Sequence, residues 1–369
     1  LPLKKFIRIM HKIVNVTVGR PKNNASNGVL IAVLSLHNLF LKNNSKSDCY
    51  YFSDKESSET RDNFKKYSYS FLSMLAVTKK LAKIDADIIY FHGGCQMIFA
   101  PMILLLGLIY KKKNIVVVPH GAYSKGSFEK RSFLKKMYSY FIEKIIYYYV
   151  NKFQCLNNNE AIDLIYIMNI DKKKIVEIPL HLDTLASKNN IHYENEEIVL
   201  FLGRIDWKMK GLDLLVDAFN DLNKKNYKLY LVGPINDEHS KKNLEIALSM
   251  NSNIIYKTPV YGIEKDKLLK KSKIFALLSR SEGLPTGLLE ALMYGKQCIT
   301  TKESNIDQKL LDDYIYECNF DPVTVKSQLN LAMSDYRNKE LVDKQIRSVL
   351  NIYNPELIYQ NHQKFIREL

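Results

Sequence analysis

The sequence predicts an α/β fold made of two domains, each with a parallel sheet covered by helices. Three observations support this prediction. The 369 residues are enough to build two hydrophobic cores. Short apolar runs typical of buried strands alternate with longer segments whose apolar residues recur at helical spacing. A polar stretch around residues 183–195 divides these alternating segments into two series.

The first series opens with an apolar strand over Lys12–Val18, a polar loop that ends in Asn27 and Gly28, and an apolar helix over 29–41. A strand that enters a helix through a glycine-containing loop is typical of a nucleotide-binding βα unit. The same pattern is equally typical of a plain connection, so this loop alone does not decide between the two.

Two later strands of the first series end in a histidine followed by glycine: 87–92 ends in His92, and 115–120 ends in His120. Because the two histidines occupy equivalent strand ends, we favour a functional role for His120 over that of an ordinary surface or core residue. The other expected strands are 48–52, 152–156 and 175–178, and the expected helices are 63–83, 128–150 and one near Glu160.

The second series predicts a separate domain. Its expected strands are 198–203, 228–233, 253–256, 274–278 and 297–300, with helices over 212–222 and 238–250. The sequence therefore divides into an N-terminal domain over residues 1–190, a C-terminal domain over 191–350, and a basic amphipathic helix within 351–369.

The stretch from residue 273 to residue 295 combines several features of an anion-binding site. A buried strand leads through a polar turn into a helix, with Pro285 suited to its start and Gly295 to its end. The backbone N–H groups of such a turn and the helix dipole together favour a phosphate group. Glu282 and Glu290 flank this seat. Since carboxylates repel phosphate, we expect them to bind hydroxyl groups beside it, which indicates a sugar nucleotide.

Two cations are expected at the same sheet edge. Arg204 follows a strand and Lys210 precedes a helix, within the sequence Gly203-Arg204 and Lys210-Gly211. A guanidinium can hold phosphate oxygens with two hydrogen bonds, and a lysine can act as a point charge. Cleavage of a sugar nucleotide develops negative charge on the leaving phosphate, and fixed cations can neutralise it. An exposed lysine-rich turn is the alternative, and it fits Lys208 better than Arg204.

The patterns S-x-x-E-G-x-P-x-x-x-L-E-A-x-x-x-G over residues 279–295 and G-R-x5-K-G over 203–211 resemble the retaining GT-B glycosyltransferases of family 4. This resemblance implies two Rossmann-like domains whose sheets face an interdomain cleft, with the C-terminal helix crossing back to the first domain. It also implies a metal-independent transfer from a nucleotide-diphosphate sugar, with a UDP-sugar favoured.

The resemblance implies roles for individual residues as well. Glu290 would bind the ribose hydroxyls and Glu282 the hydroxyls of the donor sugar, while Arg204 and Lys210 would hold the phosphates. His120 would point at the donor sugar, and His92 and Asn27 are candidates for acceptor contacts. The remaining donor-binding candidates are Gly28, Val260, Gly283, Leu284, Pro285 and Thr286. The family usually has a Gly-Gly pair where this chain has Asn27-Gly28, which weakens the assignment of Gly28.

A metal site is not expected. Asp85-Ala-Asp87 has the D-x-D spacing that holds a divalent ion in some glycosyltransferases. This pair comes before a strand rather than after one, so its carboxylates would lie at the opposite edge of the sheet from the other candidates.

The net charge of +15 indicates a partner of opposite sign. No nucleic-acid recognition motif is apparent. Residues 127–151 interleave lysines with aromatic side chains, a pattern that fits an anionic membrane surface and equally fits a helix with its aromatic side in the core. A membrane contact would suit a lipid-linked glycan acceptor of a bacterial surface polysaccharide.

The five scattered cysteines, the lack of a signal-peptide pattern and the lack of a long apolar run favour a cytoplasmic protein, peripheral on the inner face of the plasma membrane. Two alternatives to a glycosyltransferase remain at this point. One is another GT-B enzyme acting on sugar nucleotides, such as an epimerase, and the other is a non-catalytic protein that binds nucleic acid or glycan.

Overall fold

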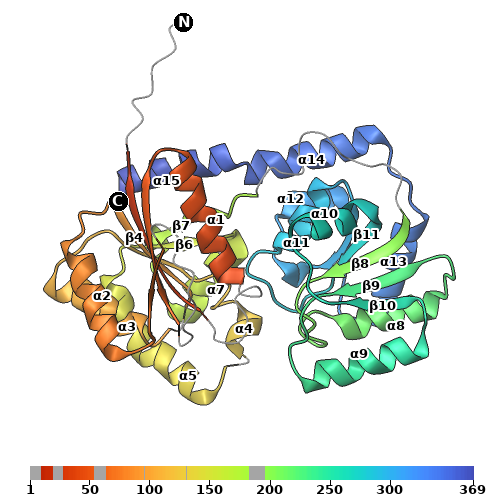
Figure 1. Ribbon diagram of the computed structural model, residues 1–369, viewed down its shortest axis with the longest axis horizontal. Coiled ribbons are helices and arrows are strands. Elements are labelled where there is room, and N and C mark those ends of the chain that lie inside the picture. The colour runs from red at the N-terminus through yellow and green to blue at the C-terminus, as the bar shows by residue number, and fades with distance from the viewer. Residues whose placement is uncertain (1–9, 20–27, 54–63, 95, 130, 183–195) are drawn as a thin grey trace, which may run out of the picture. The chain divides into compact units, whose positions relative to one another are not determined.

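The computed structural model describes residues 10–19, 28–53, 64–94, 96–129, 131–182 and 196–369. Backbone contacts divide the chain into two compact units (Figure 1). The first comprises Leu1–Tyr123, Phe128–His181 and Ile358–Leu369, and the second comprises Ser124–Ser127 and Leu182–Leu357. Each unit contains one parallel sheet flanked by helices, which confirms the predicted fold class.

The sheet of the first unit has the strand order β3-β2-β1-β4-β5-β6-β7, and the neighbouring strands pair in parallel. Its strands are β1 (Lys12–Val18), β2 (Lys46–Phe52), β3 (Phe64–Tyr67), β4 (Ile88–His92), β5 (Ile115–Val118), β6 (Lys152–Cys155) and β7 (Ile175–Glu177). The helices of this half of the chain are α1 (Gly28–Lys42), α2 (Phe71–Lys83), α3 (Phe99–Leu104), α4 (Lys125–Glu129), α5 (Phe133–Tyr138), α6 (Lys144–Ile146) and α7 (Asn158–Met168).

The sheet of the second unit has the strand order β10-β9-β8-β11-β12-β13, again parallel. Its strands are β8 (Glu196–Leu202), β9 (Lys228–Val232), β10 (Ile254–Lys257), β11 (Ser272–Leu277), β12 (Gln297–Thr301) and β13 (Ile315–Cys318). The helices that follow are α8 (Leu212–Leu222), α9 (Glu238–Met250), α10 (Gly262–Lys271), α11 (Thr286–Met293), α12 (Gln308–Tyr314), α13 (Pro322–Ser334), α14 (Lys339–Tyr353) and α15 (Pro355–Glu368).

Two predicted helices differ in the structure. The helix expected over 63–83 begins only at Phe71, because Phe64–Tyr67 pairs with β2 as the edge strand β3 and the Ser70 hydroxyl caps the helix that follows. The helix expected over 128–150 is broken after α4 and resumes at Phe133. At the break, the guanidinium of Arg131 lies over the ring of Tyr123, 4.8 Å from its centre, in a cation–π contact.

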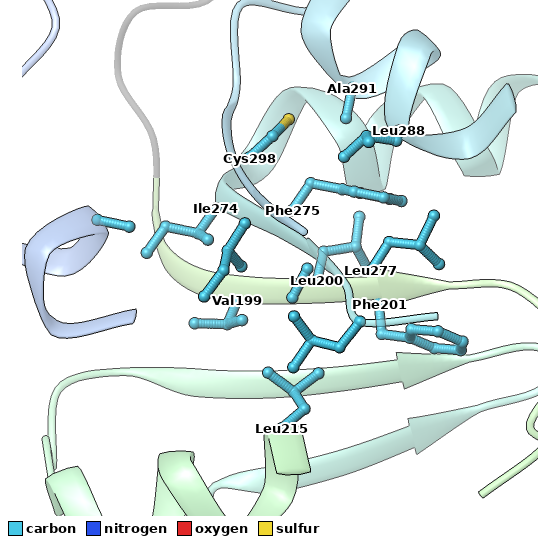
Figure 2. Close-up of a cluster of buried hydrophobic side chains, with 14 of the residues drawn as sticks. Val199, Leu200, Phe201, Leu215, Ile274, Phe275, Leu277, Leu288, Ala291 and Cys298 are labelled. Atoms are coloured by element: carbon cyan, nitrogen blue, oxygen red, sulfur yellow. The ribbon is translucent and has the colours of Figure 1, made fainter. Parts of the chain in front are cut away.

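The core of the second unit holds β8 and β11, the two strands that lead into the candidate site. In β8, Val199, Leu200 and Phe201 are fully buried, as is Phe275 in β11 (Figure 2). Strands buried on both faces of a parallel sheet read as continuous apolar runs, which is why they could be recognised in the sequence. Burial of each large side chain contributes roughly 1.5–3 kcal/mol, so the ends of these strands are held firmly.

Helix α15 packs on the first unit. The Tyr359 hydroxyl lies 3.0 Å from Ser45 Oγ, and the Tyr90 hydroxyl lies 2.9 Å from His362 Nδ1. Among the described residues, no helix is both long enough and apolar enough to cross a bilayer. Four of the cysteines, Cys49, Cys155, Cys298 and Cys318, are buried free thiols.

Candidate active site

The candidate residues of the second unit lie at the carboxyl edge of its sheet. Strand order reverses between β8 and β11, because β9 and β10 lie on one side of this pair and β12 and β13 on the other. Ligands of open α/β sheets bind at such reversal points. Arg204 follows β8, Glu282 follows β11, and the half-buried Val260 follows β10.

Lys210 and Glu282 are in direct contact. The Lys210 ammonium donates to Glu282 Oε1, and the side chains are only 17% and 16% exposed. Ser279 Oγ donates to the same carboxylate oxygen at 2.7 Å. The sequence predicted separate partners for these two residues, phosphate for the lysine and sugar hydroxyls for the glutamate. Their pairing fixes both side chains at one place beside the turn after β11.

The turn that carries Glu282 is fastened to the segment that carries Lys210 by Arg280, a residue that no sequence pattern singled out. Arg280 donates to both carboxylate oxygens of Asp213, at 2.9 and 3.0 Å, and its backbone N–H donates to the Met209 carbonyl at 2.8 Å. Burial alone would raise the pKa of Asp213, but the hydrogen bonds from Arg280 and Lys208 lower it. Arg280 lies inside the recognised motif, yet its partner is distant in sequence, so no local pattern revealed the pair.

Gly211 allows the two segments to approach each other. Its φ of 63° is left-handed, and it occupies the N-cap position of α8 directly after Lys210. A Cβ atom at this position would lie 2.1 Å from the Leu278 carbonyl oxygen. Only glycine satisfies both the backbone conformation and the contact, which explains the Lys-Gly pair in structural terms.

Arg204 and Glu290 have partners other than the Lys210–Glu282 pair. The Arg204 side chain is 43% exposed, and Nη2 lies 3.9 Å from Asp206 Oδ2. Glu290 accepts a hydrogen bond from Lys265 Nζ at 2.8 Å and keeps 35% of its side-chain surface exposed. Glu290 is thus partly exposed, although its neighbours in α11, Leu289 and Ala291, are buried.

The predicted anion-binding site consists of the turn before α11 and the start of this helix. Pro285 is the N-cap and supplies no side-chain hydrogen bond to the first turn. A Cβ at Gly287 would lie 3.5 Å from the Leu202 carbonyl oxygen, so this turn lies against the end of β8. The Thr286 N–H, which was expected to face a phosphate, donates instead to the Leu284 carbonyl at 2.9 Å. Gly283 and Leu284 complete the turn and are half-buried.

In the first unit the two predicted histidines are in contact. His92 Nδ1 lies 3.0 Å from His120 Nε2, and His92 Nε2 lies 3.0 Å from Asn15 Oδ1. Burial lowers the pKa of His92 far below its ordinary value and that of His120 to about 4, so both rings are neutral at pH 7. His92 is 2% exposed and both of its ring nitrogens are engaged. The prediction that His92 contacts an acceptor is therefore replaced by a role as partner of His120.

The backbone at His120 is unusual. Its φ of 53° is left-handed, as is that of Gly121 at 73°. The buried carboxylate of Glu160 accepts hydrogen bonds from the N–H groups of Gly121 and Leu156. Burial raises the pKa of this carboxyl to about 7. Glu160 therefore holds the turn that presents His120, a role that no pattern in the sequence indicated.

The remaining predictions concern the loop before α1 and the D-x-D pair. Asn27 lies outside the described residues. Gly28 is the first residue of α1, and a Cβ there would meet nothing within 4 Å, so no close approach explains a glycine at this position. Asp87 Oδ2 accepts a hydrogen bond from the Lys12 N–H at 2.7 Å, at the start of β4.

Comparison with known families identifies the second unit. The sequence profile described as Glycosyl transferases group 1 matches residues 183–348. The second unit thus carries the sequence pattern of the glycosyl transferases of group 1. The family resemblance seen in the sequence is confirmed.

Curated relatives are glycosyltransferases by name. One from Campylobacter jejuni, a GalNAc-alpha-(1->4)-GalNAc-alpha-(1->3)-diNAcBac-PP-undecaprenol alpha-1,4-N-acetyl-D-galactosaminyltransferase, is 26% identical over 58% of this chain and 59% of the relative. The match thus spans less than two thirds of that relative. The capsular polysaccharide biosynthesis glycosyltransferase CapH of Staphylococcus aureus is 25% identical over 79% of this chain and 80% of the relative.

Solved structures share the fold at low sequence identity. HepE of Anabaena, in complex with UDP and glucose, has a TM-score of 0.76 at 12% identity and covers 97% of this chain and 100% of that chain. WaaG, a glycosyltransferase involved in lipopolysaccharide biosynthesis, has a TM-score of 0.66 at 13% identity and covers 96% of this chain and 98% of that chain. The two parallel-sheet units are those of the GT-B fold.

Proposed function

We propose that the protein transfers a sugar from a nucleotide-diphosphate sugar, with UDP as the favoured nucleotide, to a lipid-linked glycan. The transfer retains the anomeric configuration and uses no metal ion. The observation that carries this proposal is the partly buried Lys210–Glu282 pair at the strand-order reversal of the second unit. A fixed cation beside a hydroxyl-binding carboxylate suits a diphosphate joined to a sugar. The undecaprenol-linked substrate in the name of the Campylobacter relative supports a lipid-linked acceptor.

Each candidate residue has a proposed role in this reaction. Lys210 and Arg204 neutralise the leaving diphosphate, which makes a metal ion unnecessary. Glu282 binds hydroxyls of the donor sugar and keeps Lys210 in place. Glu290 exchanges its partner Lys265 for the ribose hydroxyls of the nucleotide. His120 contributes a hydrogen bond to the donor sugar.

The first experiment is a transfer assay with a panel of UDP-, GDP- and other nucleotide sugars and lipid-linked acceptors. Lys210→Ala should lower kcat/KM by about 100-fold or more, because a cation that stabilises the leaving group is lost. Lys225→Ala is the control, since this lysine of the second unit is exposed and should leave transfer unchanged. Equal activity of the wild type and Lys210→Ala would refute the assigned role.

The same assay tests the finer parts of the proposal. Activity that persists in EDTA supports metal independence, and loss that Mg²⁺ or Mn²⁺ restores contradicts it. The anomeric configuration of the product, read by NMR, decides retention. Conversion of the sugar nucleotide into an epimeric sugar nucleotide, without any acceptor, would indicate an epimerase in place of a transferase.

We further propose that the first unit contacts an anionic membrane, on the cytoplasmic side of a bacterial plasma membrane. The segment α5 to α6 and the residues after it expose eight large apolar side chains, here called the apolar face: Phe133, Leu134, Met137, Tyr140, Phe141, Ile142, Ile145 and Tyr148. The segment is helical throughout, because residues 139–143 form a π-helix between α5 and α6. Lys135 and Lys144 on the same segment are exposed and suit anionic lipid headgroups.

The aromatic residues of 127–151 are thus divided between two environments. Phe128 and Tyr147 are 6% and 5% exposed and belong to the core. Phe133 is 75% exposed and Phe141 is 64% exposed. An exposed apolar face of this extent, flanked by lysines, supports membrane contact over both a core helix and a nucleic-acid surface. This contact would bring the enzyme to a lipid-linked acceptor.

A further inference from the structure

A continuous chain of hydrogen bonds runs through the first unit from His120 to His37. His120 Nε2 contacts His92 Nδ1 at 3.0 Å, and His92 Nε2 contacts Asn15 Oδ1 at 3.0 Å. Asn15 Nδ2 donates to Ser47 Oγ at 3.2 Å, and Ser47 Oγ contacts His37 Nδ1 at 2.8 Å. All members except His120 are buried. The chain crosses β4, β1 and β2, which are neighbours in the sheet.

The amide of Asn15 gives this chain a direction. Because Nδ2 donates to Ser47, the carbonyl oxygen Oδ1 faces His92, and a carbonyl oxygen can only accept. His92 Nε2 must therefore carry the hydrogen of the neutral ring. Its Nδ1 is then a lone pair, so the hydrogen in the contact with His120 belongs to His120 Nε2.

The consequence falls on the outermost ring. If Nε2 carries the hydrogen of neutral His120, Nδ1 is an unprotonated acceptor. We propose that Asn15 is a positioning residue that fixes the tautomer of His120 through His92, so that His120 presents Nδ1 to a hydrogen-bond donor such as a sugar hydroxyl. This inference rests on the proposed function in its choice of a sugar ligand, but the tautomer itself does not.

A second feature supports a fixed presentation of this ring. The left-handed backbone of His120, with φ of 53°, is held by the hydrogen bond from Gly121 N–H to Glu160. Non-glycine residues in this conformation cost free energy and persist where the surroundings hold them, commonly at functional sites. Both the ring and the backbone of His120 are thus held by buried polar groups.

The direct test is NMR of the full-length protein with ¹⁵N-labelled histidine. The two ring nitrogens of His120, assigned with a His120→Gln variant, report which one is protonated. The expected result at pH 7 is a protonated Nε2 and a bare Nδ1. A protonated Nδ1, or a mixture of the two tautomers, would overturn the proposal. No substrate is needed, so this result is independent of the transferase assay.

Variants at Asn15 connect the tautomer with catalysis. Asn15→Leu removes the acceptor, so His120 should become a mixture of tautomers, and kcat should fall by about tenfold with little change in the donor KM, the loss of roughly one hydrogen bond. Asn15→Asp keeps an acceptor toward His92 and should restore both the tautomer and most of kcat. Failure of Asn15→Asp to restore the protonated Nε2, in protein with native circular dichroism, would refute the role of the acceptor.

Thr17→Val is the matched control. Thr17 is buried on the same strand, two residues from Asn15 and paired with His92 in register, and among the described residues its hydroxyl has no hydrogen-bond partner. Its replacement should change neither the tautomer nor kcat. An effect as large as that of Asn15→Leu would show that any polar loss on β1 disturbs the site. If the wild type transfers no sugar yet shows the expected tautomer, the proposed function fails and the assignment of Asn15 stands.

Discussion

Gly211 is a residue at which the site tolerates little change. Gly211→Ala should lower the free energy of unfolding of the second unit by about 3 kcal/mol, because it adds a left-handed backbone penalty to a clash with the Leu278 carbonyl. Denaturant unfolding followed by fluorescence measures this directly. Trp207 is the single tryptophan of the chain, and it is buried in the core of the second unit.

Gly262 provides the comparison for this variant. Its φ of 53° is also left-handed, but a Cβ there would meet nothing within 4 Å. Gly262→Ala should therefore cost only the backbone penalty, about 1 kcal/mol. Equal losses for the two variants would show that the approach of residue 211 to Leu278 contributes nothing to stability.

At the scale of an element, the apolar face of the α5–α6 segment predicts binding to anionic vesicles. The double variant Phe133→Ser, Phe141→Ser should weaken binding to phosphatidylglycerol vesicles by about a hundredfold, since each phenylalanine buried in lipid contributes at least about 1.5 kcal/mol. Cosedimentation with the vesicles measures the affinity.

Two further measurements separate the sources of this binding. Tyr166→Ser removes an aromatic side chain that is 87% exposed on α7, and it should leave vesicle binding unchanged. Vesicles of phosphatidylcholine should bind more weakly than phosphatidylglycerol, because Lys135 and Lys144 lose their anionic partners. Full binding by the double phenylalanine variant would exclude the apolar face as the membrane contact, and retention on DNA or RNA in its place would favour the nucleic-acid alternative.

At the scale of the whole molecule, the two units should differ in how much stability they lose at acidic pH. Burial lowers the pKa of His11, His37 and His92, that of His120 to about 4 and that of His362 to about 3, and all five lie in the first unit. Below about pH 6.5 the unfolded chain binds protons that the folded unit does not, so stability present above this pH is lost as the pH falls. Each histidine contributes up to about 1.4 kcal/mol per pH unit. Glu160, whose pKa is raised to about 7, opposes this trend, but it is one group against five.

Acid titration can separate the units because their signals differ. Between pH 6.5 and 4, far-ultraviolet circular dichroism should decrease while the fluorescence of Trp207 in the second unit stays constant. The exposed His239 of the second unit serves as a control, and His239→Asn should leave the titration unchanged. Loss of the Trp207 signal before the change in circular dichroism would contradict the prediction.

Local patterns in the sequence were sufficient for the architecture and for much of the candidate site. The apolar runs of β8 and β11, the turn with Glu282 and the Lys210-Gly211 pair are contiguous features, so they could be recognised without contacts. Strand β3 was missed because a four-residue edge strand with two lysines has little apolar signal.

The parts that could not be predicted depend on which strands become neighbours. Arg280 meets Asp213, and Asn15 meets His92, only after the sheets have formed, and no spacing in the sequence encodes either pair. The exposure of Phe133 was likewise undecided, because an aromatic helix face looks the same in sequence whether it packs inward or faces outward. Tertiary context decides such cases.

The last helix has a consequence for the synthesis of the protein. The buried Tyr90 hydroxyl in β4 finds its partner, His362, on α15, and Phe40 of α1 packs edge-on against Tyr359 of the same helix. A ribosome translates α15 after all the strands of both sheets. The sheet of the first unit is therefore translated first but is covered by α15 last. All strands of the second sheet are already translated by then. A released chain that lacks residues 358–369 would hold every strand of both sheets, with the N-terminal unit still uncovered along α1.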